Sequence, residues 1–184
     1  MDYFENDSNF KEAIGDFVIA FSELEFGLVE LCSLIDFDLR KKEETYLKYM
    51  GFQFEKKKEC LTEFIKENIP DLINIWDSLN EIIGRINHER RFIVHGVMRY
   101  SLPNESISTI IKVKNKPIKN EITIDKINKL TKQIHELNFG QNGICGEFNI
   151  LFKTNVFNKW NDLVNDPNKI VYKVENEILT KFKG

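Results

Sequence analysis

Apolar residues recur at alternating three- and four-residue steps along most of the chain, which is the spacing of amphipathic helices. The first such segment carries a second apolar stripe, so we expect it to pack between neighbouring segments rather than on a surface. The pattern predicts helices over residues 8–37, 39–49, 54–68, 71–97 and 125–137, and two more over 148–163 and 170–182.

The pattern changes between residues 98 and 124, where short β-branched segments replace the helical spacing. These segments are Met98–Leu102, Ile107–Val113 and Glu121–Ile124, separated by Pro103-Asn104 and by the turn-rich residues 115–120. They predict a small β-hairpin or a three-stranded excursion. The expected fold is therefore all-α in the main, one domain over 1–184 with a helical core (8–97), a β excursion (98–124) and C-terminal helices (125–184).

The composition is that of a soluble globular protein, with 42% apolar and 30% charged residues. A net charge of −3 argues against a protein that coats nucleic acid non-specifically, so any such contact must be local. Cys32, Cys60 and Cys145 are widely spaced, as in a reduced interior. The first residues are acidic and polar, and no stretch reaches 18 apolar residues, so we expect a cytoplasmic protein without a membrane segment.

Arginine and histidine are concentrated in one segment, RINHERRFIVHGVMR, residues 85–99. It holds four of the five arginines and two of the three histidines, whereas positive charge elsewhere is carried by lysine with one exception, Arg40. The arginine guanidinium is a planar, permanently charged fork that suits phosphate. This distribution predicts a functional site for an anionic ligand.

Continuing the helix through this segment places its charged residues on one face. At 100° per residue, His88, Arg91, His95 and Arg99 fall within about 80° of one another, opposite the apolar side chains. Arg90 lies at the edge of the apolar stripe and needs a partner. Glu25, on the helix with two apolar stripes, is the candidate, and the alternative is that Arg90 extends to solvent.

The residues RRFIVHG resemble the signature of the HEPN domains (higher eukaryotes and prokaryotes nucleotide-binding), which are all-helical bundles. That signature is an arginine, four to six residues and a histidine near a helix end, often with a small residue next. Arg90 and His95 match its two positions, and Gly96 follows. Arg91 stands where the family often has asparagine. The resemblance covers the helical part of residues 8–97 at most.

The resemblance implies a metal-independent endoribonuclease without a cofactor, built on a homodimer in which two copies of the 85–99 helix face each other. His95 would then handle the proton of a ribose 2′-hydroxyl, Arg90 or Arg91 would contact the scissile phosphate, and His88 and Arg99 would extend the anion-binding surface. It also implies a toxin–antitoxin or phage-defence setting, in which an antitoxin protein is a further partner.

Two other interpretations remain open at this point. The chain could be a non-catalytic HEPN-like module that binds RNA, a nucleotide or a protein partner. Alternatively, the cluster could have only a structural role, with Arg90 buried against Glu25. The sequence contains no glycine-rich phosphate loop and no paired-cysteine or histidine spacing typical of a metal site.

Overall fold

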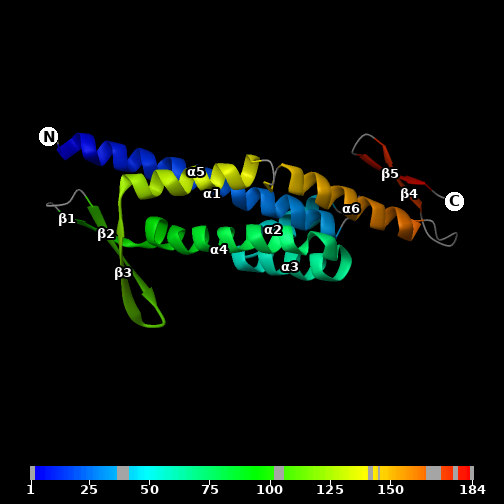
Figure 1. The fold of residues 1–184 in the computed structure, drawn as a ribbon, viewed down its shortest axis with the longest axis horizontal. Helices are drawn as coiled ribbons and strands as arrows, with labels where there is room; N and C mark the ends of the chain where they lie inside the picture. Colours follow the sequence, from blue (N-terminus) through cyan, green and yellow to red (C-terminus); the bar gives the residue numbers. More distant parts are fainter. Residues whose placement is uncertain are drawn as a thin grey trace. The chain divides into compact units, whose positions relative to one another are not determined.

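The protein is mostly helical, with small antiparallel sheets (Figure 1). The structure, a computed structural model, describes residues 3–36, 42–101, 106–140, 143–144, 146–164, 171–175 and 178–182. The helices are α1 (Tyr3–Ile35), α2 (Lys42–Met50), α3 (Phe54–Asn68), the 3-10 turn η2 (Pro70–Leu72), α4 (Ile73–His95), α5 (Ile124–Phe139) and α6 (Glu147–Val164). The strands are β1 (Val97–Ser101), β2 (Ser106–Val113), β3 (Lys116–Ile122), β4 (Val171–Glu175) and β5 (Ile178–Phe182).

The mainly helical fold with a β excursion after α4 is therefore confirmed. The chain forms two compact units, the first from Met1–Leu24 and Ser78–Gly140 and the second from Glu25–Asp77 and Gln141–Gly184. Both α1 and α4 contribute residues to the two units, and the single domain expected over 1–184 stays a prediction. No helix within the described part of the chain is long and apolar enough to cross a membrane.

The first unit has an apolar core supplied by helices and by one face of the sheet. The rings of Phe17 and Phe21 stack with centroids 6.3 Å apart. Thr123 begins α5 by accepting a hydrogen bond from the Lys126 amide at 3.1 Å, which satisfies a free donor at the helix start. The buried apolar side chains include Phe10, Phe17 and Phe21 of α1, Leu79, Ile83, Ile86, Phe92 and Ile93 of α4, Ile111 and Ile122 of the sheet, and Ile127, Ile134 and Leu137 of α5.

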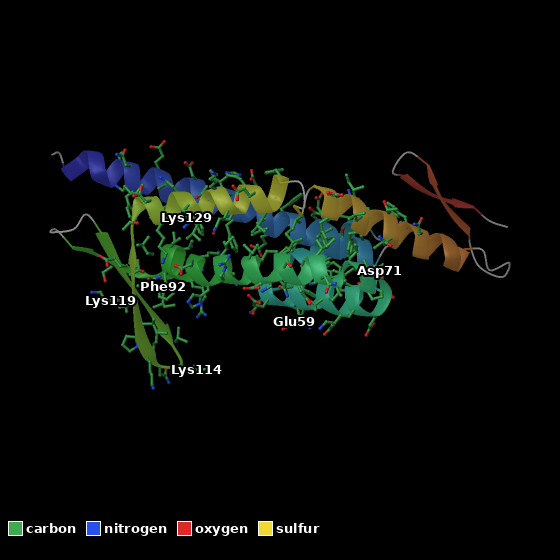
Figure 2. The ribbon with its side chains drawn as sticks, in the orientation of Figure 1. Glu59, Asp71, Phe92, Lys114, Lys119 and Lys129 are labelled. Atoms are coloured by element: carbon green, nitrogen blue, oxygen red, sulfur yellow. The ribbon has the colours of Figure 1, made fainter. Side chains whose placement is uncertain are left out.

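The sheet of the first unit is an antiparallel meander in the order β1-β2-β3. Lys114 and Asn115 form the turn between β2 and β3, and both have positive φ, 46° and 64°. A two-residue turn of this kind matches the twist of paired strands. The turn expected over 115–120 is therefore wrong, because β3 already begins at Lys116. Pro117 is tolerated since β3 is an edge strand of this sheet. Figure 2 labels Lys114 at the turn.

The second unit is organised around a buried tryptophan. Trp76 stacks on Phe148 with ring centroids 5.8 Å apart, and its indole Nε1 donates to Thr62 Oγ1 at 2.8 Å. Phe148 in turn contacts Phe152 of the same helix, α6. This aromatic cluster joins the start of α4, α3 and α6, so it fixes the packing of that unit.

The helix expected over 170–182 is replaced by an antiparallel hairpin of β4 and β5, in which Val171 pairs with Phe182 and Glu175 with Ile178. The sequence VYKVE is rich in the β-branched and aromatic residues that favour strands. This local preference outweighs a weak helical spacing over so few residues.

Candidate functional site

The arginine–histidine cluster lies on the last turns of α4. Arg85, His88, Arg91 and His95 are all exposed, while Ile86, Phe92 and Ile93 are buried. His88, Arg91 and His95 are spaced i, i+3, i+7, so they share one face of the helix. The structure therefore brings these three predicted site residues together on an exposed surface.

Arg99 does not belong to that helical face. The apolar spacing predicts that α4 continues to residue 97, but the helix ends at His95, and Arg99 lies on β1, where it pairs with Ser108 of β2. The placement of Arg99 beside His95 by ideal helix geometry is therefore wrong. Its side chain is outside the part of the chain for which side chains are described.

Arg90 has an aromatic partner in place of the carboxylate expected from the sequence. Its guanidinium carbon Cζ lies 4.6 Å from the ring centroid of Phe21 on α1, and the side chain is half-buried. Glu25 accepts a hydrogen bond from Lys57 Nζ at 2.7 Å. Both residues thus have partners other than each other. A guanidinium over an aromatic ring keeps its charge while the ring shields one of its faces from water.

Gly96 follows His95 where α4 turns into β1. A Cβ atom at this position would lie 2.4 Å from the carbonyl oxygen of Phe92 and 2.9 Å from Cβ of Thr109. Thr109 is fully buried on β2. Glycine fits here because a side chain would clash with the last turn of α4 and with the strand β2 that packs against it.

Glu89 connects three elements of the first unit and was not predicted to matter. Its Oε2 accepts from Lys126 Nζ of α5 at 2.7 Å and from Asn120 Nδ2 of β3 at 3.1 Å. The carboxylate thereby holds α4 against both α5 and the sheet. Because its partners lie more than 30 residues away in sequence, helix spacing alone gives no signal for them.

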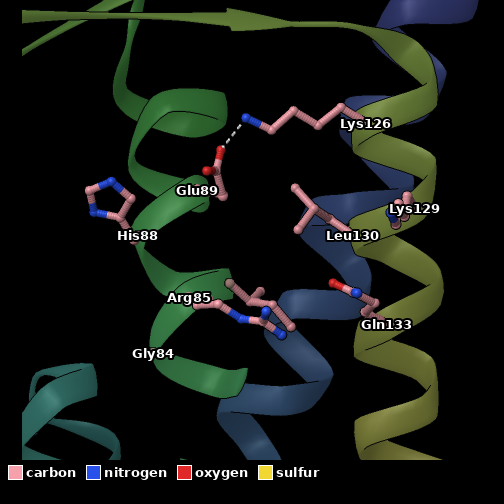
Figure 3. A pocket seen from close by; sticks show the side chains of 9 residues that line it. Gly84, Arg85, His88, Glu89, Lys126, Lys129, Leu130 and Gln133 are labelled. Atoms are coloured by element: carbon pink, nitrogen blue, oxygen red, sulfur yellow. Dashed lines mark ion pairs between the residues drawn. The ribbon is translucent and has the colours of Figure 1, made fainter. Parts of the chain in front are cut away.

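A groove of about 570 Å³ lies between α4 and α5, within the first unit (Figure 3). Its lining residues are Gly84, Arg85, Ile86, His88, Glu89, Lys126, Lys129, Leu130 and Gln133. The cluster contributes Arg85 and His88 to the groove, whereas Arg90, Arg91 and His95 do not line it. The sequence does indicate that Lys126 and Lys129 lie on the same side of α5, since residues 126, 129, 130 and 133 share one helical face.

The arrangement provides general acid–base and anion-binding groups rather than metal ligands. In the part of the chain that the structure describes, no group of three or more His, Cys, Asp or Glu side chains could hold a metal ion. Imidazole can transfer a proton near neutral pH, and guanidinium can bind a phosphate through two hydrogen bonds.

Comparison of the chain with protein-family models, with curated proteins and with solved structures gives no match.

Proposed function

We propose that the protein is a metal-independent endoribonuclease of the kind that the HEPN resemblance implies. The observation that carries this proposal is the exposed face of α4, on which Arg91 and His95 stand one turn apart at i, i+4. A base and a phosphate-binding cation at that separation can act on one phosphodiester. The overall negative charge of the chain fits a local contact with RNA better than a general affinity for nucleic acid.

The proposed reaction is an intramolecular transfer within the RNA. The 2′-oxygen forms a bond to the adjacent phosphorus, the bond from phosphorus to the 5′-oxygen breaks, and the products carry a 2′,3′-cyclic phosphate and a 5′-hydroxyl. His95 accepts the proton of the 2′-hydroxyl, and an acid returns a proton to the leaving 5′-oxygen. Arg91 donates hydrogen bonds to the non-bridging oxygens, where negative charge increases in the transition state.

Arg90 acts as a positioning residue in this proposal. Its guanidinium already stacks on Phe21, and its side chain is half-buried, whereas Arg91 is exposed. The stacked guanidinium packs α4 against α1 five residues before His95. The exposed Arg91 is therefore the better candidate for the phosphate, although it stands where the family signature often has asparagine.

A second copy of the chain would supply the acid. His88 and His95 are seven residues apart on α4, a separation of roughly 10 Å along the helix axis, which is too far for both to contact one phosphodiester. Two copies of α4 facing each other would bring an imidazole to each side of the scissile bond. The proposed active form is therefore a homodimer through this helix.

The test is cleavage of labelled RNA in the presence of EDTA by the wild-type protein, His95→Ala and Arg91→Ala. His135→Ala is the matched control, because His135 is an exposed histidine on a different helix, α5. We expect a loss of cleavage of about 10²-fold or more for His95→Ala, the size of a general acid–base contribution, and wild-type activity for His135→Ala. An RNA with a 2′-deoxy scissile ribose should stay intact.

Cleavage by His95→Ala at the wild-type rate, or no cleavage by the wild-type protein, would remove the catalytic proposal. The mass in solution is the companion measurement, since a monomer cannot bring two copies of α4 together. An endoribonuclease acting on its own cell's RNA needs control. We therefore propose a cytoplasmic toxin–antitoxin or phage-defence role with an antitoxin protein as partner, an inference that rests on the resemblance alone.

The groove between α4 and α5 favours a second candidate, a non-catalytic module that binds RNA or a nucleotide. The cations of the groove come from Arg85, Lys126 and Lys129, and His95 is not among its lining residues. Binding of RNA without cleavage under any of the conditions above would favour this function.

A further inference from the structure

The groove between α4 and α5 is formed by matching faces of the two helices. On α4, Arg85 and His88 are one turn apart, and on α5, Lys129 and Gln133 are one turn apart. Figure 3 shows the side chains of Arg85 from α4 and of Leu130 and Gln133 from α5 between the two helices, while the ring of His88 lies on the other side of α4 in this view. A volume of about 570 Å³ is within the range of sites for small organic ligands.

The charges in this groove do not cancel. Its one lining carboxylate, Glu89, is neutralised by Lys126 at 2.7 Å, and Asn120 donates to the same oxygen. Arg85 and Lys129 remain, both exposed and neither in an ion pair with a residue that the structure describes. Two unpaired cations on opposite walls, in a chain with a net charge of −3, form a local site for an anion.

The groove also has an apolar wall suited to a flat ring. Ile86 of α4 borders the groove and is buried, and Leu130 faces the same space from α5. The amide of Gln133 can both donate and accept a hydrogen bond, as the edge of a nucleobase requires. A ligand with a phosphate and an aromatic base matches these three features together, whereas inorganic phosphate would use only the cations.

We propose that this groove is a binding site for one nucleotide of a single-stranded RNA, with its phosphate between Arg85 and Lys129 and its base against Ile86 and Leu130. That the ligand is RNA rests on the function proposed above. His88 lines the groove and shares its helical face with His95, so a strand that leaves the groove along α4 runs toward the proposed catalytic residue.

The experiment measures binding separately from cleavage. A fluorescent 2′-O-methyl RNA oligomer, which lacks the attacking hydroxyl, is titrated with the full chain and followed by anisotropy. We expect Arg85→Ala and Lys129→Ala each to weaken the Kd about tenfold, the size of one charge-assisted hydrogen bond. A plot of the logarithm of the association constant against the logarithm of the salt concentration has a negative slope. In the double variant this slope should be less steep by about 1.4, since each phosphate contact to single-stranded RNA contributes about 0.7.

Lys132→Ala is the matched control, because Lys132 is a lysine of the same helix that does not line the groove and has 80% of its side chain exposed. It should bind about as tightly as wild type. Wild-type binding by the Arg85→Ala/Lys129→Ala double variant, or an equal loss in Lys132→Ala, would overturn the groove assignment.

The same titration keeps this proposal apart from the nuclease proposal. If His95→Ala binds the oligomer normally and the groove variants do not, the groove assignment stands whether or not the wild-type protein cleaves RNA. Competition with a free nucleoside monophosphate distinguishes the source of the ligand. Displacement of the oligomer only at a large excess supports an RNA site, while tight binding of the monophosphate with no binding of the oligomer overturns it.

Discussion

Replacing Gly96, the residue that links α4 to β1, with alanine should destabilise the protein. The added Cβ would lie 2.4 Å from the Phe92 carbonyl oxygen and 2.9 Å from Cβ of Thr109. Neither atom is at the end of a flexible side chain, so relief requires the backbone to move at the end of α4 and in β2. Overpacking a closed site typically costs about 1–3 kcal/mol, and two rigid contacts place Gly96→Ala at about 2–3 kcal/mol.

Gly15→Ala is the matched comparison, because the same methyl group is added to a glycine with open space. Gly15 is an exposed residue within α1, and apart from its own stretch of helix no atom lies within 4 Å of the position that its added methyl group would take. Alanine lowers the conformational freedom of the unfolded chain and should raise the free energy of unfolding by about 0.5–1 kcal/mol. The two variants should therefore differ by roughly 3 kcal/mol, with opposite signs.

Urea denaturation followed by far-ultraviolet circular dichroism measures both changes as shifts of the midpoint at constant m. The steric reasoning is refuted if Gly96→Ala unfolds at or above the wild-type midpoint, or if Gly15→Ala loses as much stability as Gly96→Ala. The result also bears on the site. A folded fraction of Gly96→Ala that cleaves RNA poorly would link the packing of Thr109 on this turn to the position of His95.

Three further substitutions test two ion pairs of the second unit. Glu25→Ala should lower the free energy of unfolding by about 3 kcal/mol, because it leaves the ammonium of Lys57, whose side chain is 2% exposed, without its carboxylate. Lys57→Met should lower it by less than about 1 kcal/mol, since Glu25 is 33% exposed and can be hydrated. Equal losses in urea denaturation would contradict this asymmetry. Burial alone would raise the pKa of Asp36, but hydrogen bonds from Lys48 and Tyr49 outweigh it and lower the pKa below 3.8. The stability from Asp36 is therefore present above pH 3.8 and lost as the pH falls through the lowered value. Asp36→Asn should be less stable than wild type near neutral pH, and the two curves should converge in strong acid; a constant difference from neutral pH to strong acid would rule out this linkage.

Much of the helical architecture could be predicted from local signals. α3 begins and ends at the predicted residues, Phe54 and Asn68, since Gly51 and Pro70 interrupt the apolar spacing on either side. The turn at Lys114-Asn115 could not, because a lysine with positive φ has no sequence signature and the turn-rich residues 115–120 predict a later, longer turn. The helix α4 ends at His95, two residues before the predicted end, and β1 begins at Val97. Arg99 therefore lies on a strand instead of on the helix.

The sequence by itself determined the helical class, which follows from the apolar spacing within each segment. It also determined that histidine and arginine gather at the end of α4, because that follows from the residues of this one segment. Only the tertiary structure decided the partners. In the tertiary structure Arg90 packs on the ring of Phe21, Glu25 pairs with the ammonium of Lys57, and Lys129 of α5 lines the same groove as Arg85 of α4. Such contacts join segments far apart in the chain and depend on which side chains meet when the segments pack. The spacing of residues within one segment does not indicate which residue of another segment it will contact.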